Sequence, residues 1–151
     1  MLRKFVEEKH FIFADRVDRW EDAIRLGCRP LEADRTVDET YADQIIECVR
    51  KYGPYIVIMP NIAIPHSQEG ATGVRKTTIS FMKINEPVHF DGDDPEKDAT
   101  LFFTLASNNS EEHLANMSAL SEILLNEDLM KELNDASSPE DLIRLQEQYL
   151  D

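Results

Sequence analysis

The chain has 151 residues, of which 42% are hydrophobic and 30% are charged, a balance typical of a folded globular domain. Thirty acidic and sixteen basic residues give a formal net charge of −14, which argues against nucleic acids and anionic membranes as partners because both attract clustered Lys and Arg. No apolar run approaches the roughly 18 to 20 residues of a membrane span or forms a secretory signal, so we expect a cytoplasmic protein without membrane insertion.

The first predicted elements are a strand and a helix. Residues 10–14 are mostly aromatic and β-branched, which favours a strand. Residues 18–34 carry apolar side chains at mainly helical spacings. Gly27 and Pro30 are expected to break or kink this helix.

A second helix and two short apolar runs follow. Residues 36–39 have the S/T-x-x-E pattern of a capping box, which predicts a helix that begins there and runs to about Lys51. The Gly-Pro pair at 53–54 is expected to end it. The runs at 56–59 and 62–64 flank Pro60-Asn61 and are rich in Ile.

The middle of the chain predicts further strands. Residues 77–84 alternate well enough for a strand, and residues 87–90 are expected to form a short edge strand because they begin with proline. An acidic, turn-rich loop follows at 91–95. Residues 100–106 are almost continuously apolar, which is typical of a strand covered on both faces.

The last part of the chain predicts helices. One is expected to start with Ser110 as its N-cap, followed by an acidic first turn. Its apolar residues recur at spacings of three and four: Leu114, Met117, Leu120, Ile123 and Leu124. A final helix is expected after Ser138-Pro139. The pattern as a whole predicts one layered α/β domain over residues 1–151, with a mixed sheet of about five strands flanked by helices.

Of the four histidines, two are candidates for chemistry. His10 and His89 lie in or beside short strands, where a structural or surface role is expected. His66 follows the Ile-rich run and Pro65, where a strand gives way to a polar loop, and reactive groups are often placed there on a rigid scaffold. His113 lies in the first turn of a helix that follows another core strand, so the two rings could meet in space.

Three kinds of chemistry could use such a pair. A metal site is disfavoured because neither ring has an acidic residue at H-x-x-E or H-E-x-x-H spacing, and Cys28 and Cys48 form no C-x-x-C pair. Hydrolysis by a serine or a cysteine is disfavoured because G-x-S-x-G is absent and Cys48 falls inside a helical apolar stripe. The third is nucleophilic catalysis by the imidazole itself, which attacks phosphorus well and passes the group on.

Three stretches carry a resemblance to a known family: GPYIVIMPNIAIPHS at 53–67, EPVHF at 86–90 and SEEHLANMSALSEIL at 110–124. Together they resemble the enzyme IIA domain of the mannitol–fructose class of the bacterial phosphotransferase system. The ascorbate-type branch is the most similar, because its free-standing IIA carries a GPY-I-V-I-x-P-x-I-A-x-P-H segment. The resemblance covers about residues 10–150.

The resemblance implies a role for each matching residue. His66 would accept a phosphoryl group from the histidine phosphocarrier protein and pass it to a cysteine of the IIB component, with a membrane IIC component involved only indirectly. His113 would contact the phosphoryl group or the first ring without being phosphorylated. Arg50 would help to hold the phosphoryl oxygens. Neither a cofactor nor a metal is expected.

Two points stay open at this stage. Ascorbate-type members often continue after the histidine with arginine and proline, whereas this chain reads Ser67-Gln-Glu-Gly70, which weakens the choice of sugar branch. The alternative function is a regulatory phosphohistidine module of the same fold that is not coupled to transport. A more distant one is a non-catalytic domain that binds a small ligand.

Overall fold

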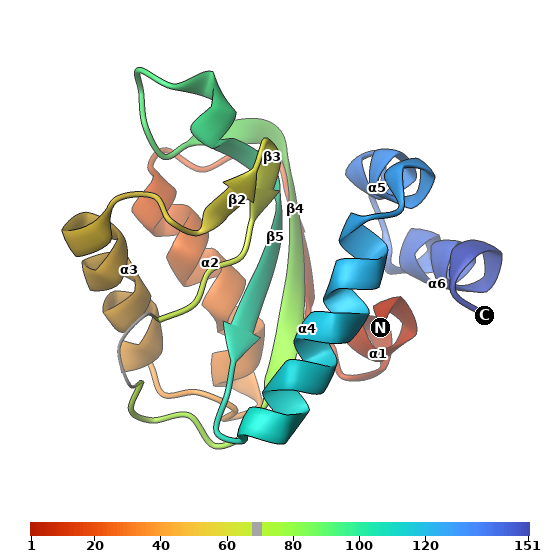
Figure 1. Cartoon of the computed structure of the whole chain (residues 1–151), viewed down its shortest axis with the longest axis horizontal. Helices are drawn as coiled ribbons and strands as arrows, with labels where there is room; N and C mark the ends of the chain where they lie inside the picture. The colour runs from red at the N-terminus through yellow and green to blue at the C-terminus, as the bar shows by residue number, and fades with distance from the viewer. Residues whose placement is uncertain (68–70) are drawn as a thin grey trace.

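Two long strands, β4 (Thr78–His89) and β5 (Asp98–Ala106), form the middle of the sheet in the computed structural model of the chain (Figure 1). Their side chains are buried over most of their length, as expected for strands between two layers of helices. The structure describes residues 1–67 and 71–151, so residues 68–70 of the polar loop expected after the Ile-rich run lie outside the described residues. Three shorter strands complete the sheet: β1 (Phe11–Ala14), β2 (Val57–Met59) and β3 (Asn61–Ala63).

The five strands are arranged in the order β1-β4-β5-β3-β2 and form both parallel and antiparallel pairs. β4 and β5 are antiparallel, whereas β1 pairs in parallel with β4 and β3 pairs in parallel with β5. β2 and β3 form an antiparallel pair that turns at Asn61, whose φ of 74° is better tolerated by Asn than by most residues. The predicted mixed sheet is confirmed. Because β3 and β5 run in parallel, their C-terminal ends lie at the same edge of the sheet.

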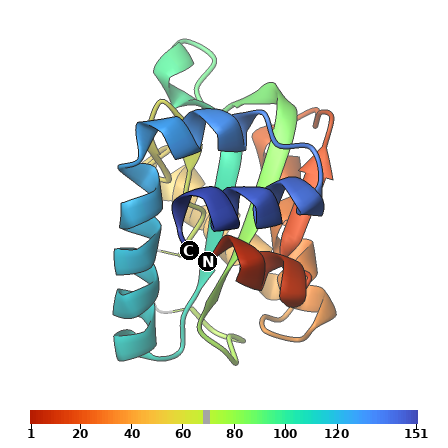
Figure 2. The ribbon, with the colours of Figure 1, turned by 90° about the vertical axis from the view of Figure 1, so that its right-hand side faces the viewer.

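Helices cover both faces of this sheet, which confirms the predicted α/β class. Figures 1 and 2 show α2 and α3 on one face and the other four helices on the opposite face. Each face has its own apolar core of buried side chains. No helix among the described residues is long and apolar enough to cross a membrane. The helices are α1 (Leu2–Glu7), α2 (Trp20–Ala33), α3 (Thr40–Tyr52), α4 (Ser110–Leu124), α5 (Glu127–Asn134) and α6 (Pro139–Tyr149), with a short 3₁₀ turn, η1 (Pro95–Lys97).

Helix α2 is continuous through Gly27 and Pro30, so the break expected there does not occur. Gly27 instead allows the helix to pack closely on the sheet, because a Cβ atom there would lie 3.1 Å from Thr104 Oγ1. The hydroxyl of Ser80 also donates a hydrogen bond to the Gly27 carbonyl at 3.0 Å. The glycine is therefore a packing residue.

The predicted capping box at Thr36 is wrong. Helix α3 begins at Thr40, after Glu39, and no side chain caps its N-terminus. The buried Thr36 hydroxyl donates instead to Asp34 Oδ1 at 2.6 Å, a local alternative that threonine hydroxyls often find. The other end is as predicted, because the helix stops at Gly53, whose φ is 82°.

Residues 87–90 do not form a separate strand. β4 runs without interruption from residue 78 to residue 89. Its residues 81–84 pair with β1, and its last residues, 88 and 89, pair with β5. Its register with β5 shifts between Lys83 and Val88, and three successive residues there, 85–87, are exposed. The proline is tolerated because it lies in this irregular part of the ladder.

The C-terminal helices largely follow the prediction. The N-cap of α4 is Asn109 and not Ser110, since the Asn109 side chain accepts from Glu112 N at 2.9 Å. Leu114, expected on the apolar stripe, is 72% exposed. Helix α6 begins after Ser138 as predicted. The short helices α1 and α5 were not predicted, because six and eight residues give little periodicity.

Candidate functional site

His66 lies just beyond β3, on a segment held from both sides. The Pro65 carbonyl accepts a hydrogen bond from Leu105 N of β5 at 2.9 Å, and Ile64 N donates to Ile56 O at 2.8 Å. Proline also restricts Ile64 to an extended conformation. The backbone that carries His66 is therefore fixed to the central strand of the sheet.

The imidazole ring of His66 has a defined orientation. Its Nδ1 atom lies 2.6 Å from the carbonyl oxygen of Ile64. Because a carbonyl oxygen only accepts, Nδ1 carries a proton, and in the neutral ring the lone pair is therefore on Nε2. The ring is half-buried, so Nε2 is the nitrogen available as a nucleophile.

Tyr55 contacts His66 in two ways. Its hydroxyl donates a hydrogen bond to the backbone carbonyl of His66, and the two rings meet edge to face, with centroids 5.1 Å apart and planes at 88°. The tight turn after α3 places Tyr55 there, because Tyr55 N donates to Gly53 O at 2.8 Å. Sequence reasoning did not single out Tyr55.

A second tyrosine also contacts this part of the chain. Tyr41 of α3 is 3% exposed, and its hydroxyl donates to Leu105 O at 2.6 Å. The backbone of Ser67 also hydrogen-bonds to this phenol. Burial raises the pKa of Tyr41, so the phenol stays protonated and keeps donating at neutral pH. Tyr41 thus joins β5 to the residue that follows His66.

The fold places His113 at the same edge of the sheet as His66. β5 ends at Ala106, and α4 begins at Ser110, so His113 lies in the first turns of a helix that starts beside the ends of β3 and β5. Its ring is half-buried. Backbone N–H groups in the first turn of a helix favour an anion nearby. The topology therefore brings the two predicted histidines to one side of the molecule.

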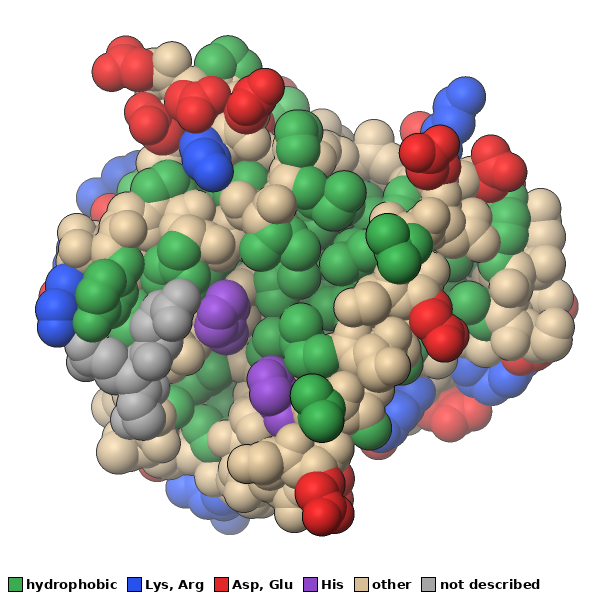
Figure 3. Space-filling model, viewed as in Figure 1, with side chains coloured by type: hydrophobic (Ala, Val, Ile, Leu, Met, Phe, Trp, Pro, Cys, Tyr) green, Lys and Arg blue, Asp and Glu red, His purple; other side chains and the backbone are tan. Residues whose placement is uncertain are grey.

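This side of the molecule is also apolar. Figure 3 shows two histidine side chains close together, beside a broad surface of hydrophobic side chains. Several large apolar side chains are exposed on α3, β2 and α4: Tyr52 50%, Ile58 50%, Met59 40% and Leu114 72%. Exposed apolar residues that gather around polar groups commonly mark a protein-binding surface.

Arg50 makes other contacts. Its guanidinium lies 2.7 Å from Glu47 and 3.5 Å from Glu21 of α2, and the bond to Glu47 is the main cause that raises its pKa. These contacts place the guanidinium on the side of α3 that faces α2. Its role at the phosphoryl group stays a prediction.

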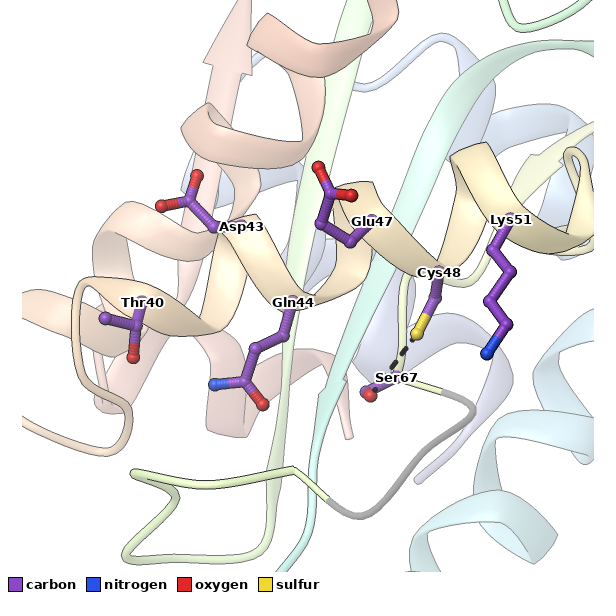
Figure 4. A pocket seen from close by; sticks show the side chains of 7 residues that line it. All are labelled: Thr40, Asp43, Gln44, Glu47, Cys48, Lys51 and Ser67. Carbon is purple, nitrogen blue, oxygen red and sulfur yellow. Dashed lines mark hydrogen bonds between the residues drawn. The ribbon is translucent and has the colours of Figure 1, made fainter.

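A cavity of about 460 Å³ lies between α3 and Ser67. Figure 4 shows Cys48 and Lys51 extending from α3 toward Ser67, with Cys48 Sγ 3.7 Å from Ser67 Oγ. The remaining lining residues are polar or acidic: Thr40, Asp43, Gln44 and Glu47. Lys51 and Ser67, the residue after His66, therefore line the same cavity.

Sequence reasoning missed Tyr41, Tyr55 and Lys51. Tyr41 and Lys51 had only helical spacing to identify them, which is equally typical of ordinary core or surface positions. Tyr55 was marked only by its place after the Gly-Pro pair. Among residues 1–67 and 71–151, no group of three or more His, Cys, Asp or Glu side chains is arranged to hold a metal ion.

Comparisons with known proteins match this chain to EIIA components of the sugar phosphotransferase system. The sequence profile of the family described as "Phosphoenolpyruvate-dependent sugar phosphotransferase system, EIIA 2" matches residues 4–149. An ascorbate-specific PTS system EIIA component of Escherichia coli K12 is 30% identical over 107 residues, which cover 71% of this chain and 68% of that protein. Its namesake in Mycoplasma pneumoniae is 42% identical over 74 residues, so the match covers 49% of this chain and less than half, 46%, of that relative.

Solved structures give the same result for the fold. The solution structure of the mannitol-specific cryptic phosphotransferase enzyme IIA of Escherichia coli superposes with a TM-score of 0.81. The match covers 98% of this chain and 99% of the other, at 25% sequence identity. The layered arrangement of helices and strands is therefore shared over the full length.

Proposed function

Because the chain belongs to the EIIA 2 family of the phosphoenolpyruvate-dependent sugar phosphotransferase system, we propose that it carries a phosphoryl group on Nε2 of His66 during sugar uptake. The observation that carries this proposal is the 2.6 Å contact between Nδ1 and the Ile64 carbonyl. In the neutral ring this contact leaves Nε2 unprotonated, and the neutral ring is the form that attacks phosphorus.

The proposed reaction consists of two transfers. In the first, the Nε2 lone pair attacks the phosphoryl group of the phosphorylated histidine phosphocarrier protein, the donor P–N bond breaks, and a new P–N bond forms on His66. In the second, a cysteine thiolate of a IIB component attacks the same phosphorus, and the bond to Nε2 breaks. The proton stays on Nδ1, hydrogen-bonded to the Ile64 carbonyl, so His66 releases no proton in either step.

Charge on the phosphoryl group in flight would be balanced by groups around His66. Such transfers depend mainly on positioning and electrostatic stabilisation. We propose that His113 and the N-terminal turn of α4 contribute donors on one side. Arg50 remains the proposed guanidinium partner, and it would have to leave Glu47 and Glu21 to reach the group. Lys51, which lines the cavity beside Ser67, is the alternative cation.

The rest of the proposal concerns partners and extent. The exposed apolar side chains of α3, β2 and α4 would form the docking surface for both the carrier and the IIB component. Residues 1–151 would act as a single EIIA domain. Since relatives of about 30% identity are named for ascorbate and for mannitol, both kinds of IIB component are candidate acceptors, with the ascorbate type proposed first.

The direct test is phosphorylation in vitro. The protein is incubated with phosphoenolpyruvate, enzyme I and the histidine phosphocarrier protein, and its intact mass is measured. The wild type should gain one phosphoryl group, whereas His66→Ala should gain none and remain folded, because the half-buried His66 ring belongs to neither apolar core. The matched control His89→Ala removes an exposed histidine and should be phosphorylated normally. A phosphoryl gain in His66→Ala would mean that another residue is the acceptor.

A further inference from the structure

We propose that Tyr55 is a positioning residue for the transfer reaction, holding the ring and backbone of His66 so that Nε2 faces the incoming phosphorus. The inference rests on the proposed role of His66 and adds a residue to the His66, His113 and Arg50 set. It concerns a part of the site that comes from the turn after α3, outside the strand that carries the nucleophile.

The contacts of Tyr55 act on both parts of His66. The hydroxyl donates to the His66 carbonyl and so fixes the backbone, while the edge-to-face contact at 5.1 Å and 88° fixes the plane of the ring. The bond from Nδ1 to Ile64 O anchors one edge of the ring, but by itself it would allow the ring to tilt about that bond. The aromatic contact removes this remaining freedom.

Tyr55 is itself held in place. Hydrogen bonds within the turn fix its backbone, from Tyr55 N to Gly53 O at 2.8 Å and from Val57 N to Pro54 O at 3.2 Å. The Tyr52 ring packs against the Tyr55 ring with centroids 6.4 Å apart. A side chain supported in this way can transmit the position of α3 to the nucleophile.

The role is positioning and not catalysis. A phenol has one proton to donate, and Tyr55 gives it to the His66 carbonyl, so it is not offered to a phosphoryl oxygen. In-line transfer requires close alignment of the attacking atom, and a misplacement of about 1 Å can cost ~10²-fold in rate. Loss of the Tyr55 contacts should therefore lower the rate of transfer without weakening the binding of the donor.

The first measurement uses the unphosphorylated protein. Long-range ¹H–¹⁵N spectra of the His66 ring should show a single tautomer with the proton on Nδ1 in the wild type. Tyr55→Phe keeps the ring but loses the hydroxyl bond, and Tyr55→Ala loses both contacts, so a mixture of tautomers should grow in that order. Tyr149→Phe is the matched control, because its hydroxyl bonds Glu132 on the helices of the opposite face.

The second measurement is single-turnover transfer from the phosphorylated carrier protein. We expect the maximal rate to fall about tenfold in Tyr55→Phe and ~10²-fold in Tyr55→Ala, with an unchanged carrier concentration at half-maximal rate. Tyr149→Phe should match the wild type.

Two results would overturn the proposal. One is a wild-type tautomer signal together with wild-type rates in both Tyr55 variants. The other is a raised half-saturating concentration at an unchanged maximal rate, which would make Tyr55 a docking residue. If Tyr55→Ala does not fold, Tyr55→Phe decides. If the wild type accepts no phosphoryl group, the proposed function fails, while the ring spectra still decide whether Tyr55 positions His66.

Discussion

His10 and His66 are both held by short hydrogen bonds, but the partners differ in charge. The buried His10 ring lies between two carboxylates, with Nε2 2.6 Å from Asp34 Oδ2 and Nδ1 3.2 Å from Glu8 Oε2. The half-buried His66 ring has a neutral partner, the Ile64 carbonyl at 2.6 Å. One ring is enclosed by negative charge, and the other is oriented without it.

The difference shows how the same side chain can serve structure or chemistry. A carboxylate attracts a protonated ring and would repel an incoming phosphoryl group, whereas a carbonyl fixes the tautomer and leaves the second nitrogen neutral. His10 joins the start of β1 to the end of α2 through Asp34. The chemistry expected of His66 requires that no carboxylate take the place of Ile64 O.

The largest effect is expected for His113, the second histidine ring proposed to assist phosphoryl transfer to His66. His113→Ala should slow phosphoryl gain from the carrier by ~10²–10³-fold, the usual loss for one well-placed donor, without abolishing it, because Nε2 of His66 can still attack. Rapid-quench kinetics measure this rate. His10→Gln is the control, and its rate per folded molecule should equal that of the wild type. Wild-type kinetics in His113→Ala would remove His113 from the site.

A smaller effect is expected for the cation. Arg50→Lys keeps a positive charge but loses the planar fork that binds two oxygens, so transfer should slow by ~10²-fold if Arg50 leaves its carboxylate partners during the reaction. Lys51→Gln is measured beside it in the same rapid-quench assay. A normal rate in Arg50→Lys combined with slow transfer in Lys51→Gln would assign the cation to Lys51.

The smallest effect concerns His10, the histidine with a structural role. Asp34→Asn replaces its carboxylate partner with a neutral acceptor, like the partner of His66. Burial opposes ionisation of Asp34, but hydrogen bonds from Thr36 and His10 outweigh it and lower the pKa of this carboxyl. A lowered folded-state pKa stabilises the protein above the unfolded-state pKa, and this contribution is lost as the pH falls through the folded value.

We therefore expect Asp34→Asn to lower the free energy of unfolding by about 1–2 kcal/mol at pH 7. The difference from the wild type should shrink as the pH falls below about 4, where the unfolded carboxyl becomes protonated. Urea unfolding at several pH values measures this. Phosphoryl acceptance at pH 7 should be unchanged, and a penalty that stays constant down to pH 3 would contradict the assignment to the Asp34 charge.

Local sequence patterns predicted the elements whose conformation is set by residues close to them in the sequence. The apolar run at 100–106 gave β5, and the Gly-Pro pair at 53–54 gave the end of α3, because burial and backbone geometry there follow from neighbouring residues. Thr36 was misread because its hydroxyl could either accept from a backbone N–H as a helix cap or donate to a nearby carboxylate. In the structure it donates to Asp34, two residues earlier. The segment at 87–90 was misread as a separate strand because Pro87 suggested a strand start, whereas β4 continues through the register shift between Lys83 and Val88.

The site was predictable only as a set of candidates. His66 and His113 follow core strands, and a parallel β3–β5 pair was enough to bring them to one edge. The Arg50 guanidinium bonds mainly to Glu47, three residues earlier on α3, a pairing that helical spacing could have indicated. Its weaker contact with Glu21 comes from another helix, and no local pattern predicts it. Tyr55 was invisible for a similar reason, since its contact with His66 depends on how α3 ends relative to β3.

Strand β3 lies between the buried strand β5 and the edge strand β2, and these two neighbours should differ in amide hydrogen exchange. Amides in β5, buried between two neighbours and two helical layers, should exchange only on global unfolding, whereas those of β2, a three-residue edge strand with Ile58 and Met59 exposed, should exchange by local opening. The segment that carries His66 is bonded to Leu105 N of β5 and to Ile56 O, the residue before β2. The Leu105 amide, which donates to the Pro65 carbonyl, should therefore exchange as slowly as the other β5 amides even when β2 opens locally.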